Sequence, residues 1–565
     1  MGGCNHLYCS QSDQKKSDPH IVKTSCLILG GNEFAFSIAD GSAEFMPTIN
    51  LERGKMDPVH EVSSQTILFT KQGKAKMDVI LNTANLKSVP QGVKVPTYNR
   101  SELSPGILHF GVGNFPRAHM AHYLEELHER GKGMDWGVIG ASLRNSSSRT
   151  RDVLKNQNFL YTVVECDTNI CNARVMGSLL GFVRIDHAPV LEKLIDPRIR
   201  IVSLCITEGA YFIDAKTGGL AVDDPQIRAD TEDQDNPQTI FGLIIKALKM
   251  RKQQGVEPFT VLSLDNLPGN GDLTKQTVVG LAQLADRAVA RWIESHVAFP
   301  NCMVDCIVPA TSELERNLVA ERFGIADEAP VFCEPFRQWV VEDDFPSGRP
   351  ALEHVGAEFV EDIVPYELMK LRILNAGHAS FCYAGALLGF HYGHEAIDDP
   401  DLRAWVRALQ KREVLRTLKP LPGISYDEYL EKVLVRFSNS EIKDTIARLA
   451  FSGSDRQPKF VLPTLRDALA ANGPVDGLAL EVALWCRYCT CVDEDNNTIE
   501  LEDIHAAELK RRAIEAIERP GAFLEFSEVF GSLSENTRFL NAFARWLTAI
   551  HENGVRATIQ KYLKN

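Results

Sequence analysis

The chain has 565 residues, of which 44% are hydrophobic and 24% are charged, and its formal net charge at pH 7 is −14. This length suggests two or three domains with ample apolar material for their cores. Because no basic excess is present to neutralise phosphates, the composition argues against non-specific nucleic-acid binding. No apolar run reaches the roughly 18 residues of a membrane helix, and the start lacks an apolar signal-peptide core, so we expect neither a membrane span nor secretion.

The cysteines indicate a reducing compartment. They number thirteen, an odd count, and they are scattered along the chain, which favours free thiols and a cytoplasmic protein. Cys486, Cys489 and Cys491 lie close together, but no second pair with zinc spacing follows them, so we expect no metal site. Near the start, Gly2 and Cys4 suggest acylation, yet His6 stands where the myristoylation pattern has Ser or Thr.

Residues 1–90 are predicted to form an N-terminal extension without chemistry of its own. Residues 1 to about 20 read as disordered, and residues 21–86 contain strand-like runs separated by Gly and Asp, which predicts a small β-rich appendix. Several prolines then mark a linker into the next domain.

Residues 106–131 run from a strand through a glycine turn into an amphipathic helix, which is how a dinucleotide-binding fold opens. Glycines permit the tight turn and the close approach of a pyrophosphate, which would lie on the N-terminus of the helix that follows. The third glycine of the general pattern is absent. We expect the coenzyme to contact residues of this turn: Gly111, Gly113, Asn114, Phe115 and Arg117.

The second strand ends at Ser142, where NAD-binding folds place an acidic residue for the adenine ribose. Three arginines, Arg144, Arg149 and Arg151, instead precede the first carboxylate, Asp152. They are able to face a 2′-phosphate, or they form part of a solvated helix start. The choice between NAD and NADP stays open, with NAD as the first expectation.

Strand and helix patterns then alternate, as in a parallel, doubly wound sheet, and we assign residues 91–348 to a Rossmann-like domain. Two stretches, 159–166 and 172–185, look like an inserted hairpin. Strands are expected at 200–207, 258–265 and 303–309, and helices at 239–255 and 273–297. Asn266 and Asp305 follow strands, at the edge where such sheets bind ligands; the alternative is turn formation or capping.

From residue 349 to residue 565 the pattern is helical, which predicts an all-α second domain. The amphipathic segments are 401–418, 425–437, 440–451, 478–491, 504–517 and 538–554. The fold class is therefore α/β, with a Rossmann-like sheet domain, an all-α C-terminal domain and the small N-terminal appendix.

The stretch 366–389 is an apolar helix pattern that carries polar groups where a core helix has leucines. At 100° per residue, Glu367, Lys370, Asn375 and His378 fall on one side of an α-helix. A lysine among leucines can have its pKa lowered and act as a general base, while an amide and an imidazole can bind an alcohol or an alkoxide. The alternative is a surface lysine, a helix-interior asparagine and a satisfied histidine.

The spacing of Lys, Asn and His, with four and then two residues between them, resembles the catalytic signature of the polyol-specific long-chain dehydrogenases, the mannitol dehydrogenase family. Supporting motifs are GVGNFPRAH at 111–119, DNLPGNG at 265–271, EPFRQWVVED at 334–343 and RFLNAFARWL at 538–547. The resemblance covers roughly residues 100–565.

The resemblance implies an active site between the two domains, where a hydride passes between a polyol carbon and the nicotinamide of NAD(H) or NADP(H) without a metal. Lys370 matches the general base, and Asn375 and Asn266 match donors that stabilise the alkoxide. His378 matches a group that orients the substrate. Glu367 matches a carboxylate that passes the proton to solvent; otherwise it is a helix-surface acid paired with Lys370.

Asp305, Arg448 and Arg456 match substrate-binding positions of the family. The family more often has lysine where this chain has Arg456, and it usually has arginine at Cys306. A guanidinium suits a phosphate better than a hydroxyl, so these departures bear on the identity of the substrate.

The function expected from the resemblance is NAD(P)-dependent interconversion of D-mannitol and D-fructose, with small-molecule partners and a monomer or small homo-oligomer. The second expectation is the same chemistry on mannitol 1-phosphate and fructose 6-phosphate, favoured by Arg448, Arg456 and Lys459. A hexuronate reductase is third. A nucleotide-binding regulatory protein is the non-enzyme alternative, and a non-enzyme has no need of a buried base.

Overall fold

The computed structural model describes residues 24–29, 33–38 and 78–564, apart from residues 169, 185 and 215–216. The chain divides into two units, residues 1–74 and residues 75–565. In the first unit, β1 (Thr24–Leu29) and β2 (Glu33–Ile38) form an antiparallel pair. The rest of the expected β-rich appendix, and the expected disorder of residues 1–20, lie outside the described residues.

The second unit begins earlier than residue 91, where the prolines suggested a domain start. β3 (Val79–Ile80) pairs in parallel with β12 (Ile325–Ala326), and Leu81 is fully buried. Lys94 then bridges to the strand at Arg174. The N–H groups of Val79 and Leu81 donate to carbonyl oxygens of Gly324 and Ala326, so residues 78–90 pack with the sheet domain.

A five-stranded parallel sheet forms the centre of the first domain, in the order β10-β9-β4-β5-β8. Its strands are β4 (Pro105–Phe110), β5 (Gly137–Ala141), β8 (Leu179–Phe182), β9 (Ile201–Leu204) and β10 (Thr260–Ser263). The chain leaves β4 toward β5 on one side and later returns to pair β9 with its other side. The carboxyl end of β4 is therefore the switch point where such sheets bind ligands.

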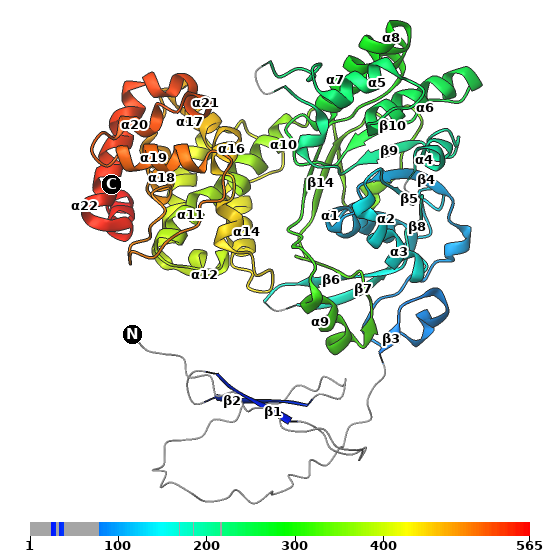
Figure 1. The fold of residues 1–565 in the computed structure, drawn as a ribbon, viewed down its shortest axis with the longest axis horizontal. Helices are drawn as coiled ribbons and strands as arrows, with labels where there is room; N and C mark the ends of the chain where they lie inside the picture. The colour runs from blue at the N-terminus through cyan, green and yellow to red at the C-terminus, as the bar shows by residue number, and fades with distance from the viewer. Residues whose placement is uncertain are drawn as a thin grey trace, which may run out of the picture. The chain divides into compact units, whose positions relative to one another are not determined.

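Helices cover one face of this sheet, and helices with further strands cover the other (Figure 1). Ile107 packs into one core and its neighbour Leu108 into the other, as expected of a strand buried on both sides. The α-helices of this domain are α1 (Asn114–Ala118), α2 (Met120–Glu129), α3 (Ser148–Asn156), α4 (His187–Leu194), α5 (Pro225–Glu232), α6 (Ile240–Gln254), α7 (Asn270–Ala285), α8 (Arg287–His296) and α9 (Glu313–Phe323). Its short 3₁₀ helices are η1 (Thr83–Ser88), η2 (Arg100–Glu102), η3 (Asn145–Ser147), η4 (Glu208–Tyr211) and η5 (Leu352–Val355).

The single helix expected at 273–297 is wrong, because α7 and α8 are separate helices. Asp286 between them has an extended backbone, with a φ of −153°, and its side chain accepts hydrogen bonds from the N–H groups of Ala288 and Val289. A capping aspartate thus interrupts a continuous hydrophobic period, which periodicity alone does not reveal.

Two smaller sheets complete this domain and correct two expectations. The expected hairpin is present as β6 (Tyr161–Cys166) and β7 (Cys171–Met176), but its second stretch divides at residue 177 and the remainder is β8 of the main sheet. β13 (Val331–Cys333) extends the hairpin. The strand expected to continue the parallel sheet is β11 (Cys302–Asp305), which instead pairs antiparallel with β14 (Gln338–Glu342), and β15 (Glu358–Val360) follows β14.

The second domain is helical, drawn from yellow-green to red in Figure 1. Its core surrounds α11, α18 and α22 and includes Trp405, Trp485 and Trp546. The elements are α10 (Val364–Met369), η6 (Lys370–Asn375), α11 (Ala376–Leu387), α12 (Gly393–Asp398), α13 (Pro400–Leu409), η7 (Gln410–Val414), η8 (Leu415–Thr417), α14 (Tyr426–Phe437), α15 (Ile446–Ala450), α16 (Gly453–Phe460), α17 (Leu462–Ala470), α18 (Asp476–Tyr488), α19 (Ala506–Glu515), α20 (Gly521–Leu524), α21 (Ser527–Phe530), η9 (Gly531–Glu535) and α22 (Thr537–Lys564).

Three helices of this domain differ from the expected segments. The helix expected at 440–451 is only α15, which Thr445 caps. The segment 401–418 changes from α13 to the π-helical η7 and then to η8. The last helix continues to Lys564 beyond a kink at Gly554. None of the helices in the described ranges is long and apolar enough to cross a membrane.

Candidate active site

A cavity of about 1160 Å³ lies where the two domains meet. The sheet domain contributes the turns after β4, β9, β10 and β11, and the helical domain contributes η6, α11 and the segment from residue 441 to residue 456. Most of the expected site residues line it: Phe115, Asn266, Asp305, Lys370, Asn375, His378, Arg448 and Arg456. Glu367, Gly111, Gly113, Asn114 and Arg117 do not.

Lys370 is buried, with 8% of its surface exposed. Its Nζ donates to Asn266 Oδ1 at 2.6 Å and to the Val304 carbonyl oxygen at 2.7 Å. Both partners are acceptors, so each receives one hydrogen and the remaining position on nitrogen carries either a third proton or a lone pair. Burial lowers the pKa of Lys370, and Arg436 adds to this effect while Asp305 opposes it. The neutral amine, with its lone pair free for the cavity, is therefore favoured relative to a lysine in water.

The helix that carries these residues widens into a π-helix from Lys370 to Asn375. The expected 100° spacing does not apply there, because a π-turn holds more residues per turn. Lys370, Asn375 and His378 nevertheless line one cavity, whereas Glu367 lines a smaller neighbouring cavity of about 20 Å³. The four side chains expected on one side of the helix therefore line two cavities, and Lys370 lines both of them. Such π-turns occur frequently at functional sites.

Asn375 and His378 both line the main cavity. Asn375 Oδ1 is buried and has no hydrogen-bond partner among the described residues. The ring of His378 lies 4.2 Å from that of Phe437, centroid to centroid. Burial, together with the nearby Arg448, Arg456 and Arg436, lowers the pKa of His378 well below its usual range. The imidazole is therefore neutral near pH 7 and able to donate to or accept from a hydroxyl group.

Glu367 lies on α10, one turn before Lys370. Its carboxylate accepts from the N–H of Gly269 at 3.0 Å. Burial raises its pKa to about 7, against the opposing effects of that hydrogen bond and of Lys370. Lys370 and Asn266 also line the small cavity, whose volume is enough for one water molecule.

In the turn after β4, the backbone at Gly111 packs closely against the carbonyl group of Cys205. Gly111 has a φ of +90°, and a Cβ atom there would lie 1.9 Å from the carbonyl oxygen of Cys205, so only glycine fits. A Cβ atom at Gly113 would meet nothing closer than 3.9 Å, which leaves that side of the turn open. Asn114 donates to Pro309 O at 3.1 Å and to Thr311 Oγ1 at 3.0 Å, fixing the turn against the loop after β11.

Arg117 differs from its expected role at the coenzyme. It is buried, and its guanidinium donates to the carbonyl oxygens of Gly113 and Ala329 and to Asn114 Oδ1. These contacts brace the turn from behind, and the helix that follows begins at Asn114 rather than at Arg117. Phe115 lines the cavity and stacks on His119, with ring centroids 5.0 Å apart.

At the end of β5, Ser142 is buried and its Oγ lies 2.9 Å from that of Ser147. Arg151 pairs with Asp152 at 2.7 Å. The side chains of Arg144 and Arg149 are exposed and form no ion pair within the described ranges. The adenine end of a dinucleotide would therefore meet arginines and serines here rather than a carboxylate.

The three expected substrate residues already have protein partners. Asp305 accepts two hydrogen bonds from Arg436, at 2.7 and 2.9 Å. Arg448 forms a bidentate ion pair with Asp444, four residues earlier. Arg456 donates to the carbonyl oxygens of Leu449 and Arg448.

Some residues of the site were not expected from the sequence. Asp265, within the quoted DNLPGNG motif, lines the cavity and accepts from the N–H groups of Ile206 and Thr207 at 2.9 and 3.0 Å. It thereby holds Thr207, whose φ is +75°, in a strained conformation of the kind found at functional sites. Arg436 gave no sequence signal, because it reads as one charged position on an amphipathic helix.

In the part of the chain that the structure describes, no group of three or more His, Cys, Asp or Glu side chains is arranged to hold a metal ion. Cys486 and Cys489 are buried in and after α18, and Cys491 is largely buried.

Comparisons with known proteins agree with this architecture. Residues 105–354 match the model of the mannitol dehydrogenase Rossmann domain, and residues 362–551 match that of the mannitol dehydrogenase C-terminal domain. The chain is 46% identical to the mannitol 2-dehydrogenase of Cereibacter sphaeroides, over 84% of this chain and 99% of that protein. It is 40% identical to the mannitol 2-dehydrogenase of Phaeosphaeria nodorum, over 85% of each.

Two solved structures have the same fold. One is the Pseudomonas fluorescens mannitol 2-dehydrogenase in ternary complex with NAD and D-mannitol, with a TM-score of 0.78 and 38% identity over 86% of this chain and 99% of that chain. The other is a D-sorbitol dehydrogenase in substrate-free form, with a TM-score of 0.79 and 34% identity over 85% of this chain and 100% of that chain.

Proposed function

The chain belongs to the mannitol dehydrogenase family, and we propose that it is an NAD(P)-dependent mannitol 2-dehydrogenase that interconverts D-mannitol and D-fructose. The observation that carries this proposal is Lys370, a buried amine at the interdomain cavity whose two hydrogen-bond acceptors leave one position for a substrate proton. A nucleotide-binding regulatory protein has no use for such a group.

In this proposal Lys370 accepts the hydroxyl proton of the polyol during oxidation and returns it during reduction. Asn266 accepts from Lys370 through Oδ1, so its amide nitrogen is available to donate to the alkoxide. Asn375, with its unpartnered buried amide oxygen, and the neutral His378 hold further hydroxyl groups. Donors fixed before the reaction stabilise the developing oxyanion without reorganisation.

The turn after β4 fits a dinucleotide, because Gly111 lets the backbone turn tightly against the Cys205 carbonyl and the open side of Gly113 leaves room for a pyrophosphate. Phe115, two residues after Gly113, lines the cavity together with Thr207 and Asp265. A nicotinamide coenzyme supplies the hydride acceptor or donor when it is bound there. Asn114 and Arg117 keep the turn in this shape through the contacts described above.

Glu367 is proposed to pass the proton between Lys370 and solvent. The small cavity that Glu367 and Lys370 both line has a volume of about 20 Å³, which holds one water molecule. A carboxyl group with a pKa of about 7 is able to accept and release protons near neutral pH.

The substrate is proposed to be the neutral sugar rather than its phosphate. Arg448 already forms a bidentate pair with Asp444, and a phosphate would have to displace that carboxylate or lie beside it. One nitrogen of the Arg456 guanidinium already donates to a backbone carbonyl oxygen, that of Leu449. Neutral hydroxyl groups need only single hydrogen bonds, which both arginines are still able to offer. Fructose 6-phosphate stays the second candidate because two guanidinium groups line one cavity.

We propose NAD(H) as the coenzyme, as in the ternary complex of the Pseudomonas enzyme. Use of NADP(H) is the second candidate, favoured by the exposed Arg144 and Arg149 where a ribose-binding carboxylate is lacking. Free thiols at Cys205, Cys302 and other described cysteines support our proposal that the protein works in a reducing compartment such as the cytoplasm.

Initial rates with fructose, fructose 6-phosphate and fructuronate, each with NADH and with NADPH, test these proposals together. We expect fructose with NADH to give the highest kcat/KM. A preference for fructose 6-phosphate or fructuronate would refute the substrate and leave the reaction class standing. Binding of NADH without turnover of any of the three would refute the enzyme itself.

A further inference from the structure

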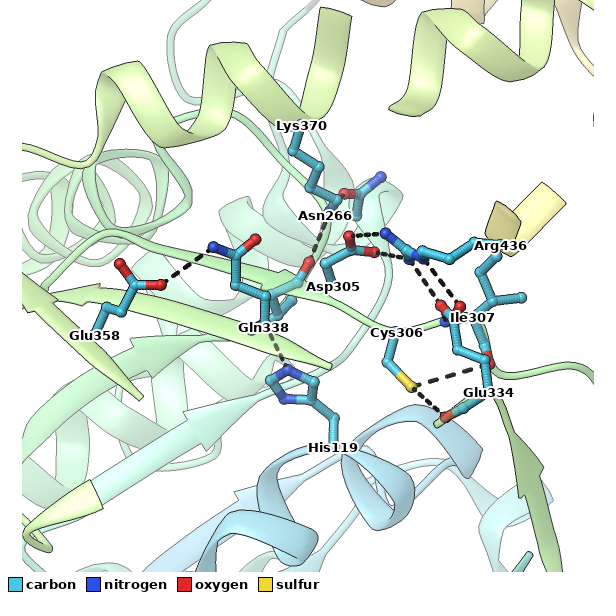
Figure 2. Close-up of polar contacts among 11 residues, drawn as sticks. His119, Asn266, Asp305, Cys306, Ile307, Glu334, Gln338, Glu358, Lys370 and Arg436 are labelled. Atoms are coloured by element: carbon cyan, nitrogen blue, oxygen red, sulfur yellow. Dashed lines mark hydrogen bonds and ion pairs between the residues drawn. The ribbon is translucent and has the colours of Figure 1, made fainter. Parts of the chain in front are cut away.

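Arg436 joins the two domains beside the reacting groups. It lies near the end of α14 in the helical domain, and its guanidinium reaches two carboxylates of the sheet domain. It donates to Asp305 at 2.7 and 2.9 Å and to Glu334 at 2.9 and 2.7 Å. Figure 2 shows Arg436 lying between Asp305 and Glu334. We call these three residues the Arg436 clamp.

The clamp is buried, and its side chains are fully hydrogen-bonded. Its three side chains are exposed by only 6%, 4% and 2% for Arg436, Asp305 and Glu334. The guanidinium also lies over the ring of Phe336, 4.0 Å from its centroid, and the N–H of Ile307 donates to Glu334 Oε1 at 2.6 Å. Every oxygen of the two carboxylates is bonded to a donor, as a buried ion cluster requires.

The charges of the clamp do not cancel, because two carboxylates face one guanidinium. Burial works against ionisation of Asp305, yet Arg436 and, more weakly, Lys370 outweigh it and lower the pKa of Asp305. Burial raises the pKa of Glu334 despite the attraction of Arg436. Asp305 is therefore the firmly ionised member of the intact clamp, and Glu334 is the more readily protonated of the two carboxylates.

The clamp is linked to Lys370 by the backbone next to Asp305 and by electrostatic interactions. Asp305 lines the cavity and directly follows Val304, whose carbonyl oxygen accepts from Lys370 Nζ at 2.7 Å. The charged and titratable groups that face Lys370 come from several elements: Asp305 and Cys302 of β11, Arg436 of α14, Glu367 of α10, and His119 between α1 and α2. Arg436 is the one cation in this set.

Resting on the function proposed above, we propose that Arg436 is a positioning residue of the reaction: it fixes Asp305 and the Val304 carbonyl against Lys370 across the domain boundary, and it balances the charge of Asp305 so that Lys370 stays a neutral base. Arg436 itself does not line the main cavity, so it acts through Asp305 and Lys370 rather than on the substrate.

Removing the guanidinium tests whether Arg436 acts on Lys370 through its charge or only holds the two domains together. In Arg436→Met, Lys370 loses the neighbouring positive charge that disfavours a second cation, so the protonated amine is favoured relative to the wild type. The pH at which kcat/KM for mannitol oxidation rises should move upward by about one unit, with a loss of about 10- to 100-fold near neutral pH that shrinks at high pH. A residue that only holds the domains together would lower the rate equally at every pH.

Arg436→Lys keeps the charge but loses the fork that bonds two carboxylates at once. We expect its pH midpoint to stay near that of the wild type while kcat/KM falls about tenfold. Glu334→Gln keeps the two hydrogen bonds from Arg436 to Asp305. The pH midpoint of kcat/KM in this variant should therefore equal that of the wild type. Arg407→Met is the matched control, since Arg407 on α13 forms a bidentate pair with Glu431 on α14, at 2.8 Å for both hydrogen bonds, away from the cavity.

The experiment measures pH profiles of kcat/KM for the wild type and the four variants, with NADH binding by fluorescence as an independent check of the folded state. An unchanged midpoint in Arg436→Met overturns the proposal. If that variant does not fold, wild-type kcat/KM in Arg436→Lys overturns it equally. A wild-type enzyme that oxidises no polyol would instead refute the proposed function, so the two failures are distinguishable.

Discussion

Replacing Lys370 with alanine is the most direct test of the proposed chemistry. The amine is buried and donates both to Asn266 Oδ1 and to Val304 O, so no other side chain of the described site stands in its place as a base. General-base catalysis contributes about 10²- to 10⁴-fold, which corresponds to about 3 to 5.5 kcal/mol of transition-state stabilisation. We therefore expect kcat for mannitol oxidation to fall by at least about a hundredfold.

The pH dependence gives the sign of the effect. Burial lowers the pKa of Lys370 from its usual range, and only the neutral amine accepts a proton. Oxidation by the wild type should therefore rise with pH through one apparent pKa and then level off, while fructose reduction, which needs the protonated amine, should fall through the same region. Lys370→Ala should lose this transition in both directions.

The assay follows NADH absorbance in both directions between about pH 6 and pH 10. The control is Lys411→Ala, which removes an ion-paired lysine of the helical domain whose Nζ lies 2.8 Å from Asp427. NADH fluorescence shows whether each variant still binds coenzyme, and added primary amines should restore part of the activity of Lys370→Ala. If Lys370→Ala keeps more than about a tenth of the wild-type kcat, the assignment of the base is refuted.

Three further substitutions test the rest of the site. Glu367→Gln should lower kcat about 10- to 100-fold near neutral pH with little change in KM, because the proton route loses its carboxyl group; a kcat within about twofold of wild type speaks against that route. Asp444→Asn frees the guanidinium of Arg448 and should raise kcat/KM for fructose 6-phosphate relative to fructose by about tenfold, the value of one charged hydrogen bond. The ratio of initial rates measures this change, and an unchanged ratio would mean that Arg448 does not reach the substrate. Gly111→Ala should destabilise the fold by about 2 to 4 kcal/mol in denaturant unfolding and weaken NADH binding, because its φ of +90° and a carbonyl oxygen 1.9 Å from the new Cβ leave no room. Gly521→Ala on α20 is the control and should be near neutral, because a Cβ there would meet nothing closer than 3.9 Å and the residue does not line the cavity.

Hydrophobic period and glycine placement predict much of this fold, because those signals are local. The strand into the Gly111 turn and the long helices of the second domain follow from them. The breaks do not. The π-turn from Lys370 to Asn375 leaves the apolar pattern intact, and the separation of α7 from α8 depends on one capping aspartate, Asp286.

The residues of the site divide in the same way. Lys370, Asn375 and His378 are close together in the sequence, so their joint appearance in one cavity could be predicted. Arg436 could not be, because its partners Asp305 and Glu334 precede it by 131 and 102 residues. Only the folded chain brings them together.

Two sets of polar interactions at the proposed reaction centre join the two domains. Lys370 comes from the helical domain, but both of its acceptors belong to the sheet domain. Arg436 likewise comes from the helical domain and both of its carboxylates from the sheet domain. Buried donors and acceptors left without partners cost about 1 to 3 kcal/mol each, and charged groups cost more, so separating the domains would expose or strand every one of these groups. The same contacts that position Lys370 therefore also hold the two domains together. A substitution that weakens the contacts between the domains should reduce activity before it unfolds the core of either domain.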